Sequence, residues 1–147
     1  MEYQNQNIKA IFGYEYPDFV ISLINEAKET IDIVMYDWRW DLNILGSALG
    51  CFNQSVVRAA RRGVKIRSIV NSGANLELMR GVGINSKTLK RSGLVHAKVL
   101  IIDNKCVIIG SHNLSNNAFS ENLEASVYLP CSNIAQNFTD YFNKIWL

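Results

Sequence analysis

The chain has 147 residues, of which 48% are hydrophobic and 19% charged, and its formal net charge is +2. This length suits one domain with its own hydrophobic core, and the composition excludes an intrinsically disordered chain. The weak positive charge does not by itself indicate a nucleic-acid partner.

The sequence offers little for a metal site or a membrane anchor. Its three cysteines form no C-x-x-C pair and it holds only two histidines, so a structural zinc site has few ligands to use. The polar N-terminus has no signal-peptide core, and no apolar run approaches the ~20 residues that span a bilayer. We therefore expect a soluble, cytoplasmic protein, with residues 1–147 forming a single domain.

The first half of the chain alternates strand and helix patterns. The elements expected here are, in order, a strand over residues 8–12, a helix over 17–30, a strand over 31–38, a loop over 43–53, a helix over 54–62 and a strand over 65–70. The strand–helix–strand order predicts a right-handed crossover with parallel pairing.

The second half contains shorter apolar runs. The elements expected here are a helix over residues 76–80, a polar segment over 84–92, strands over 99–102 and 107–109 joined by a turn at 103–105, a polar loop over 115–120, a strand over 124–129, and an amphipathic helix that presents Ile134, Phe138, Phe142 and Ile145. Together the two halves predict an α/β order.

The segment over residues 37–41 has two interpretations. Its two tryptophans, Trp38 and Trp40, either cover the core while the charged residues are solvated, or they form a substrate rim together with Arg39. The second interpretation is open because aromatic and arginine side chains stack on bases and bind phosphates.

Basic residues gather in two further segments, and both have a structural and a functional interpretation. The first group is either a solvated helix C-terminus or a track for a polyphosphate, and consists of Arg58, Arg61, Arg62, Lys65 and Arg67. The second group lies just before His96, where a phosphate substrate would be near, and consists of Lys87, Lys90 and Arg91.

Reactive side chains flank the two short strands over residues 96–113. His96 and Lys98 fall on one face of an extended segment, because side chains in a strand alternate. Ser111 and Asn113 follow the second strand and return to the same end of the sheet. The structural alternative is a hairpin of the hydrophobic core with a few polar residues at its ends. An imidazole, an ammonium, a hydroxyl and an amide on one surface instead suit a phosphate.

This pattern resembles the HKD motif of the phospholipase D superfamily. The matching residues are His96, Lys98, Asp103, Gly110, Ser111 and Asn113, followed by the acidic Glu124. The resemblance, which reaches from the first helix to the last, implies a single-domain α/β/α sandwich with a mixed, mainly parallel central sheet. Within the superfamily the chain resembles the small dimeric endonucleases with one HKD motif.

The resemblance and the chemistry together assign roles to these residues. We expect His96 to attack phosphorus and form a phosphohistidine, with Lys98 and Asn113 holding the non-bridging oxygens and Ser111 adding a hydrogen bond. Glu124 is expected to accept from the other nitrogen of His96. Two residues are expected to be structural rather than catalytic, namely Asp103 and Gly110, and His112 is given no catalytic role.

One catalytic role is unfilled, because the leaving oxygen needs an acid. The resemblance implies a homodimer in which two His96 residues share one site, with no metal or other cofactor. The leading hypothesis is a sequence-nonspecific endonuclease acting on DNA or RNA. The alternatives are a hydrolase for phospholipids, of phospholipase D or cardiolipin type, and an inactive module that only binds nucleic acid.

Overall fold

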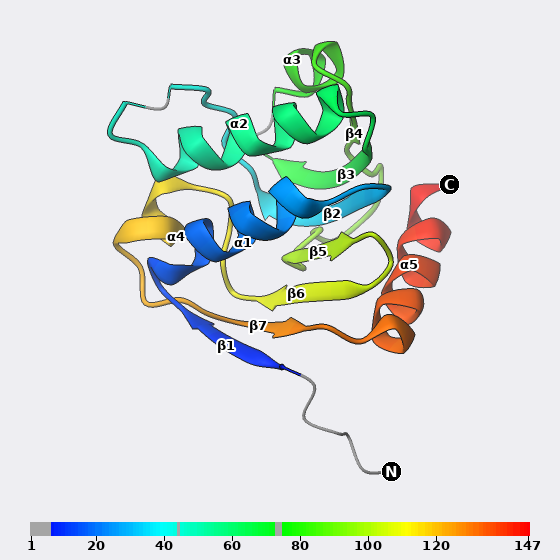
Figure 1. Cartoon of the computed structure of the whole chain (residues 1–147). Helices are drawn as coiled ribbons and strands as arrows, with labels where there is room; N and C mark the ends of the chain where they lie inside the picture. Colours follow the sequence, from blue (N-terminus) through cyan, green and yellow to red (C-terminus); the bar gives the residue numbers. More distant parts are fainter. Residues whose placement is uncertain (1–6, 44, 73–74) are drawn as a thin grey trace.

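A seven-stranded sheet with the strand order β1-β7-β6-β5-β2-β3-β4 forms the centre of the molecule (Figure 1). The computed structural model describes residues 7–43, 45–72 and 75–147. The strands are β1 (Lys9–Phe12), β2 (Thr30–Asp37), β3 (Lys65–Ser72), β4 (Ile84–Lys87), β5 (Val99–Ile102), β6 (Cys106–Gly110) and β7 (Ala125–Leu129).

Helices cover both faces of this sheet, which confirms the expected α/β/α sandwich (Figure 1). They are α1 (Glu15–Glu26), α2 (Ala48–Arg61), α3 (Leu76–Gly81), α4 (Asn116–Ser120) and α5 (Ser132–Trp146). Apolar residues of α1, α2 and α4 pack on one face, and those of α5 pack on the other. Within the described ranges no helix is both long and apolar enough to cross a membrane.

The alternation of β2 explains why its two faces are both buried. Ile31, Ile33 and Met35 belong to the core beneath α1 and α2, whereas Val34 belongs to the core beneath α5. A strand covered on both faces is nearly continuously apolar, as β2 is. Burial on both sides fixes the position of its C-terminal end, where polar residues begin.

The expectation of a mainly parallel sheet is wrong. Among the described strands, only β2–β3 and β3–β4 pair in parallel. The pairings of β1 with β7, β7 with β6, β6 with β5 and β5 with β2 are antiparallel. Parallel neighbours need a crossover of roughly a dozen residues or more, and the tight turn between β5 and β6 does not provide one.

Two short elements, β4 and α4, and the first part of α2 lie in segments that were expected to be loops or polar. Helix α2 begins at Ala48, inside the expected loop, because the Ser47 side chain accepts from the N–H of Gly50 and caps it. Residue 44 of that expected loop lies outside the described residues. Helix α4 is capped in the same way by Ser115, and β4 occupies the start of the expected polar segment.

Two arginines of the first basic group, Arg62 and Arg67, form hydrogen bonds and an ion pair within the fold. The Arg62 guanidinium donates to the carbonyl oxygens of Ile24 and Ala27 at 2.8 and 3.1 Å. Arg67 forms a two-pronged ion pair with the buried Asp32, with N–O distances of 2.8 and 2.9 Å. For these two arginines the structural interpretation is therefore the better one.

Candidate functional site

The expected catalytic residues meet at one edge of the sheet. Because β5 is antiparallel to β2 and β6, and β7 is antiparallel to β6, two strands end and two begin at this edge. His96 and Lys98 directly precede β5, Ser111 and Asn113 follow β6, and Glu124 precedes β7. Residues from separate parts of the sequence are thus carried by rigid neighbouring strands.

His96 is exposed and Lys98 is half-buried, and their side chains contact each other. The Lys98 Nζ lies 3.2 Å from Nε2 and 3.5 Å from Nδ1 of His96, whose side chain is exposed. Burial lowers the pKa of Lys98, and the charge of Glu124 opposes this shift. An imidazole in contact with a cation is a suitable arrangement for attack on a phosphate.

Tyr36 is a member of the cluster that the sequence analysis missed. Its ring centroid lies 5.2 Å from that of His96 and 5.5 Å from the Lys98 Nζ. The ring therefore supports both groups from the end of β2. The only signal in the sequence was its position, as a polar-tipped residue at the end of a strand buried on both faces.

Asn113 is oriented by the backbone of β2. Its Oδ1 accepts a hydrogen bond from the N–H of Asp37 at 3.2 Å. Because a backbone N–H only donates, this contact identifies the amide oxygen, and the amide nitrogen Nδ2 points the other way, where a ligand can reach it. No described residue accepts a hydrogen bond from that nitrogen. The expected role of Asn113 as a donor to a phosphate oxygen thus fits its geometry.

Ser111 and Glu124 contact each other rather than His96. The Ser111 hydroxyl lies 3.1 Å from Oε2 of Glu124 and 3.3 Å from the carbonyl oxygen of Ala125, and it accepts from the N–H of Ala125 at 3.0 Å. In this chain the expected hydrogen bond from His96 to Glu124 is replaced by the one from Ser111. The serine holds Glu124 at the start of β7.

The Asp103 carboxylate is bonded to the backbone at the start of β2. Its carboxylate accepts from the backbone N–H groups of Lys28, Glu29 and Thr30 at distances of 2.8 to 3.2 Å. Burial raises the pKa of Asp103, but these donors and a nearby lysine outweigh it, and the pKa is lower than usual. Asp103 and Asn104 have φ angles of +53° and +51°, which Asp and Asn tolerate better than most residues in a tight turn.

Gly110 is required by close packing between strands. A Cβ atom at this position would overlap the side chain of Ser126 and the carbonyl oxygen of Ala125. The glycine therefore lets β6 approach β7 where the chain turns towards Ser111.

His112 is enclosed and fully bonded. Its Nε2 lies 2.9 Å from the carbonyl oxygen of Gly13, and its Nδ1 lies 2.7 Å from the Ser126 hydroxyl. A carbonyl only accepts, so Nε2 carries the proton and Nδ1 accepts from Ser126. The ring stacks on Tyr16 at 4.3 Å and is 1% exposed. Burial lowers its pKa, and nothing in this geometry offers a proton to a substrate.

Two of the expected substrate-binding residues are placed elsewhere. Trp38 is 0% exposed and its indole N–H donates to Oδ1 of Asn53 at 2.8 Å, so the expectation that it stacks on a base is wrong. The Lys87 ammonium contacts the carbonyl oxygen of Trp146 and lies 4.3 Å from the centroid of its ring. It is therefore engaged with α5 instead of facing a substrate, contrary to expectation.

The other three expected substrate-binding residues remain at the surface. Arg39 and Lys90 are exposed, and Arg91 lines, together with His96, a cavity of about 300 Å³. The structure thus brings Arg91 to the catalytic cluster, while Lys90 lies on the same segment.

Comparison with known proteins agrees with this geometry. Residues 20–146 match the protein family described as cardiolipin synthase, PLD-like domain. The chain is 29% identical over 144 residues to a probable phospholipase D of Caenorhabditis elegans, covering 86% of this chain and 26% of that protein. It is 29% identical over 92 residues to the mitochondrial cardiolipin hydrolase of Mus musculus, covering 58% of this chain and 42% of that protein.

The chain therefore spans less than half the length of these two relatives. A solved structure of similar length shows the same fold. Nuc from Salmonella typhimurium, a phospholipase D family member, superposes with a TM-score of 0.80 at 22% identity, over 95% of this chain and 93% of that one.

Proposed function

Because the chain belongs to the phospholipase D superfamily, we propose that it is a metal-independent phosphodiesterase that cleaves DNA or RNA. The observation that carries this proposal is the contact between His96 and Lys98 at 3.2 Å, at the same edge of the sheet as Asn113, whose Oδ1 is held by the N–H of Asp37. A nucleophile and two donors for phosphate oxygens are thus gathered where the sheet ends.

The proposed reaction has two displacements. A ring nitrogen of His96 attacks phosphorus, and a P–N bond forms while the bond to the leaving oxygen breaks. Lys98 and Asn113 hold the non-bridging oxygens and stabilise the charge of the transition state. Water then gives a proton to a base and attacks phosphorus, the P–N bond breaks, and a phosphomonoester leaves. In this scheme Lys98 supplies the positive charge that a metal ion supplies elsewhere.

The leaving oxygen must receive a proton, and the group that donates it must come from a second copy of the chain. The second histidine of the chain, His112, is buried with both nitrogens bonded. We assign the acid to the partner's His96 in a two-fold homodimer, where each copy supplies the same group to a shared site. After protonating the leaving group, the partner's His96 accepts the proton of the attacking water.

An exposed apolar surface beside the cluster suits such a second copy. Phe12, Tyr14 and Leu123 are 60%, 78% and 102% exposed. Together with Ser111 and Glu124 they line a hollow of about 610 Å³. Clustered apolar side chains of this kind are typical of an interaction surface. Because the hollow adjoins Glu124, a copy seated there brings its own catalytic edge close to this one.

The exposed cations support a nucleic-acid substrate. Lys90 and Arg91 are exposed, and Arg91 lines the same cavity as His96. Such cations bind a chain of phosphates. A phospholipid substrate is the alternative, favoured by the apolar surface and by relatives described as a phospholipase D and a cardiolipin hydrolase. An inactive binding module is disfavoured by the intact contact of His96 with Lys98.

The test is cleavage of labelled single- and double-stranded DNA and RNA in excess EDTA, with phospholipid vesicles as a parallel substrate. We expect the wild type to cleave nucleic acid and His96→Ala to bind it without cleavage. Activity that needs added magnesium would contradict the metal-independent mechanism. Hydrolysis of the vesicles alone would replace the nuclease by the lipid alternative.

A further inference from the structure

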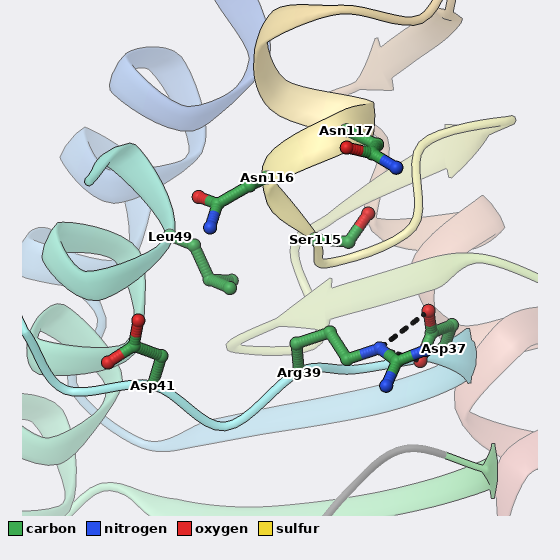
Figure 2. A pocket seen from close by; sticks show the side chains of 7 residues that line it. All are labelled: Asp37, Arg39, Asp41, Leu49, Ser115, Asn116 and Asn117. Atoms are coloured by element: carbon green, nitrogen blue, oxygen red, sulfur yellow. Dashed lines mark hydrogen bonds and ion pairs between the residues drawn. The ribbon is translucent and has the colours of Figure 1, made fainter.

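A polar pocket lies next to the catalytic cluster, between the segment that follows β2 and the start of α4 (Figure 2). Its volume is about 350 Å³, which is within the range of small-molecule sites. Its lining residues are Asp37, Arg39, Asp41, Leu49, Ser115, Asn116 and Asn117. Apart from the backbone of Asp37, which orients Asn113, none of these residues has a role in the mechanism described above.

The pocket and the catalytic cluster share one wall. Asp37 lines the pocket, and its backbone N–H donates to Oδ1 of Asn113 at 3.2 Å. The N–H of Leu114 donates to the Asp37 carbonyl at 3.0 Å, and the N–H of Arg39 donates to the Leu114 carbonyl at 2.9 Å. A phosphodiester held by the Asn113 amide therefore has one of its two ester substituents beside this pocket.

The segment that carries Arg39 is held in place by a buried side chain. Asn53, on α2, is 0% exposed and accepts from the Trp38 indole at 2.8 Å. Its Nδ2 donates to the carbonyl oxygens of Arg39 and Asp41, at 2.9 Å each. The wall of the pocket is thus preformed, which lowers the entropy lost when a ligand binds.

The side chains present both donors and acceptors to the pocket. The Nε of Arg39 lies 3.0 Å from Oδ1 and 3.1 Å from Oδ2 of Asp37. The Arg39 side chain is 64% exposed, so the other two nitrogens of its guanidinium can donate to a ligand. Oδ1 of Asn116 lies 3.3 Å from the Ser47 hydroxyl, so its Nδ2 is the free donor. Asp41, on the same segment as Arg39, adds a second carboxylate, and its Oδ1 accepts from the N–H of Asn43 at 2.9 Å (Figure 2).

The charge of the pocket identifies the kind of ligand. Two carboxylates and one guanidinium line the pocket, so its net charge is negative and a phosphate is repelled overall. An uncharged group with its own donors and acceptors fits these side chains, and the edges of nucleobases offer this combination to Arg, Asp and Asn. Leu49 forms part of the apolar floor of the pocket and is itself almost fully buried.

We propose that this pocket binds the nucleoside joined to the scissile phosphate, with Arg39 and Asn116 as its specificity-determining residues. The inference rests on the proposed nuclease function and adds to it: phosphate is held by Lys98 and Asn113, whereas the base and sugar are held separately. The enzyme then has a base preference at one position beside the cut.

The test compares substrates with and without a nucleoside. The substrates are bis(p-nitrophenyl) phosphate and the 5′ and 3′ p-nitrophenyl phosphate esters of each deoxynucleoside. For one of the two isomers, we expect Arg39→Ala and Asn116→Ala to raise KM by about tenfold, the usual value of one good base contact. Hydrolysis of bis(p-nitrophenyl) phosphate is expected to be unchanged.

Matched controls remove the same groups elsewhere. Arg61, at the far end of α2, and Asn137, on α5, are both exposed, and Arg61→Ala and Asn137→Ala are expected to behave as wild type. Equal effects of Arg39→Ala on all substrates, or no effect on any, would overturn the pocket while leaving the nuclease intact. Failure of the wild type to hydrolyse any of the esters would instead contradict the proposed function.

A lipid ligand would also be visible. If Arg39→Ala slows hydrolysis of phospholipid vesicles and leaves the nucleoside esters unaffected, the pocket binds a polar headgroup and the inference is overturned.

Discussion

The β5–β6 hairpin has two ends that use polar side chains in opposite ways. At the turn, the Asp103 carboxylate accepts from three backbone N–H groups of residues 28–30, so its capacity for hydrogen bonds is filled by the chain itself. At the open end, His96 and Lys98 contact each other and Tyr36, and His96 is exposed. Both ends belong to the same motif.

The two histidines repeat this difference. His112 has a hydrogen-bond partner at each ring nitrogen and is 1% exposed. His96 is exposed, and its ring nitrogens contact only the ammonium of Lys98 among the described residues. A side chain whose hydrogen bonds are completed within the chain holds the fold together. A side chain that is held on rigid strands but still has hydrogen-bonding groups without partners in the chain can bind a substrate.

The largest expected effect is at the open end. His96→Ala removes the proposed nucleophile, and we expect the turnover of a labelled oligonucleotide to fall at least about a thousandfold. Because His96 is exposed, thermal unfolding is expected to change little. His112→Gln, after correction for the folded fraction, is expected to retain turnover. A His96→Ala enzyme with near-normal turnover would invalidate the division between the two histidines.

Next in size is the effect of breaking the proposed dimer. Leu123→Glu places a charge on the apolar surface beside Glu124, and we expect self-association to weaken about a hundredfold. Light scattering after size-exclusion chromatography measures this, and activity should fall with the dimer. Leu78 on α3 is also exposed, at 57%, and Leu78→Glu is the matched control. A Leu123→Glu protein that remains dimeric would place the interface elsewhere.

The turn end should respond in stability rather than in activity. Asp103→Ala leaves three backbone N–H groups without their acceptor, and we expect the free energy of unfolding to fall by about 2–4 kcal/mol. Urea unfolding measures this loss, with Asp140→Ala, an exposed carboxylate on α5, as the control. Turnover of the folded enzyme is expected to stay within about twofold. A larger drop would give Asp103 a catalytic role.

The smallest effect is a pH dependence of stability. Burial holds the pKa of His112 below its usual 6.5, so the unfolded chain binds the proton more readily than the folded one. Its contribution is therefore complete above pH 6.5 and is lost as the pH falls through the folded pKa. The pKa of Asp103 is also lowered, from 3.8, so its contribution is lost in a separate, more acidic range. In His112→Gln, urea unfolding should show a flatter slope just below pH 6.5, and an unchanged slope would contradict this assignment.

The sequence predicted the parts of the site that depend on local pattern. The β5–β6 hairpin followed from two apolar runs around Asp103, and the positions of Lys98 and Asn113 followed from the motif. For Trp38 the sequence left a core and a substrate-binding interpretation open, and its burial with a hydrogen bond to Asn53 of α2 confirms the first. The place of Tyr36 was not predictable, because its contact with His96 requires β2 and β5 to be neighbours.

The remaining errors concern short elements and long-range pairing. Strand β4 and helix α4 are formed by few residues and are stabilised by their neighbours and by the Ser115 cap, so their own sequences look like loops. The direction of β5, β6 and β7 depends on turn geometry and on which strand lies beside which. Strand–helix order predicts the direction only where a helix joins two neighbouring strands, as α2 joins β2 to β3 and α3 joins β3 to β4.

The most direct test of the account is to trap the covalent intermediate. The wild-type protein is mixed with a labelled oligonucleotide, quenched in alkali during turnover, digested and sequenced by mass spectrometry. The account predicts a nucleotide phosphate attached to His96 and none attached to His112. Rapid turnover with no covalent adduct, or an adduct on His112, would contradict the claim that the open end of the hairpin performs the chemistry.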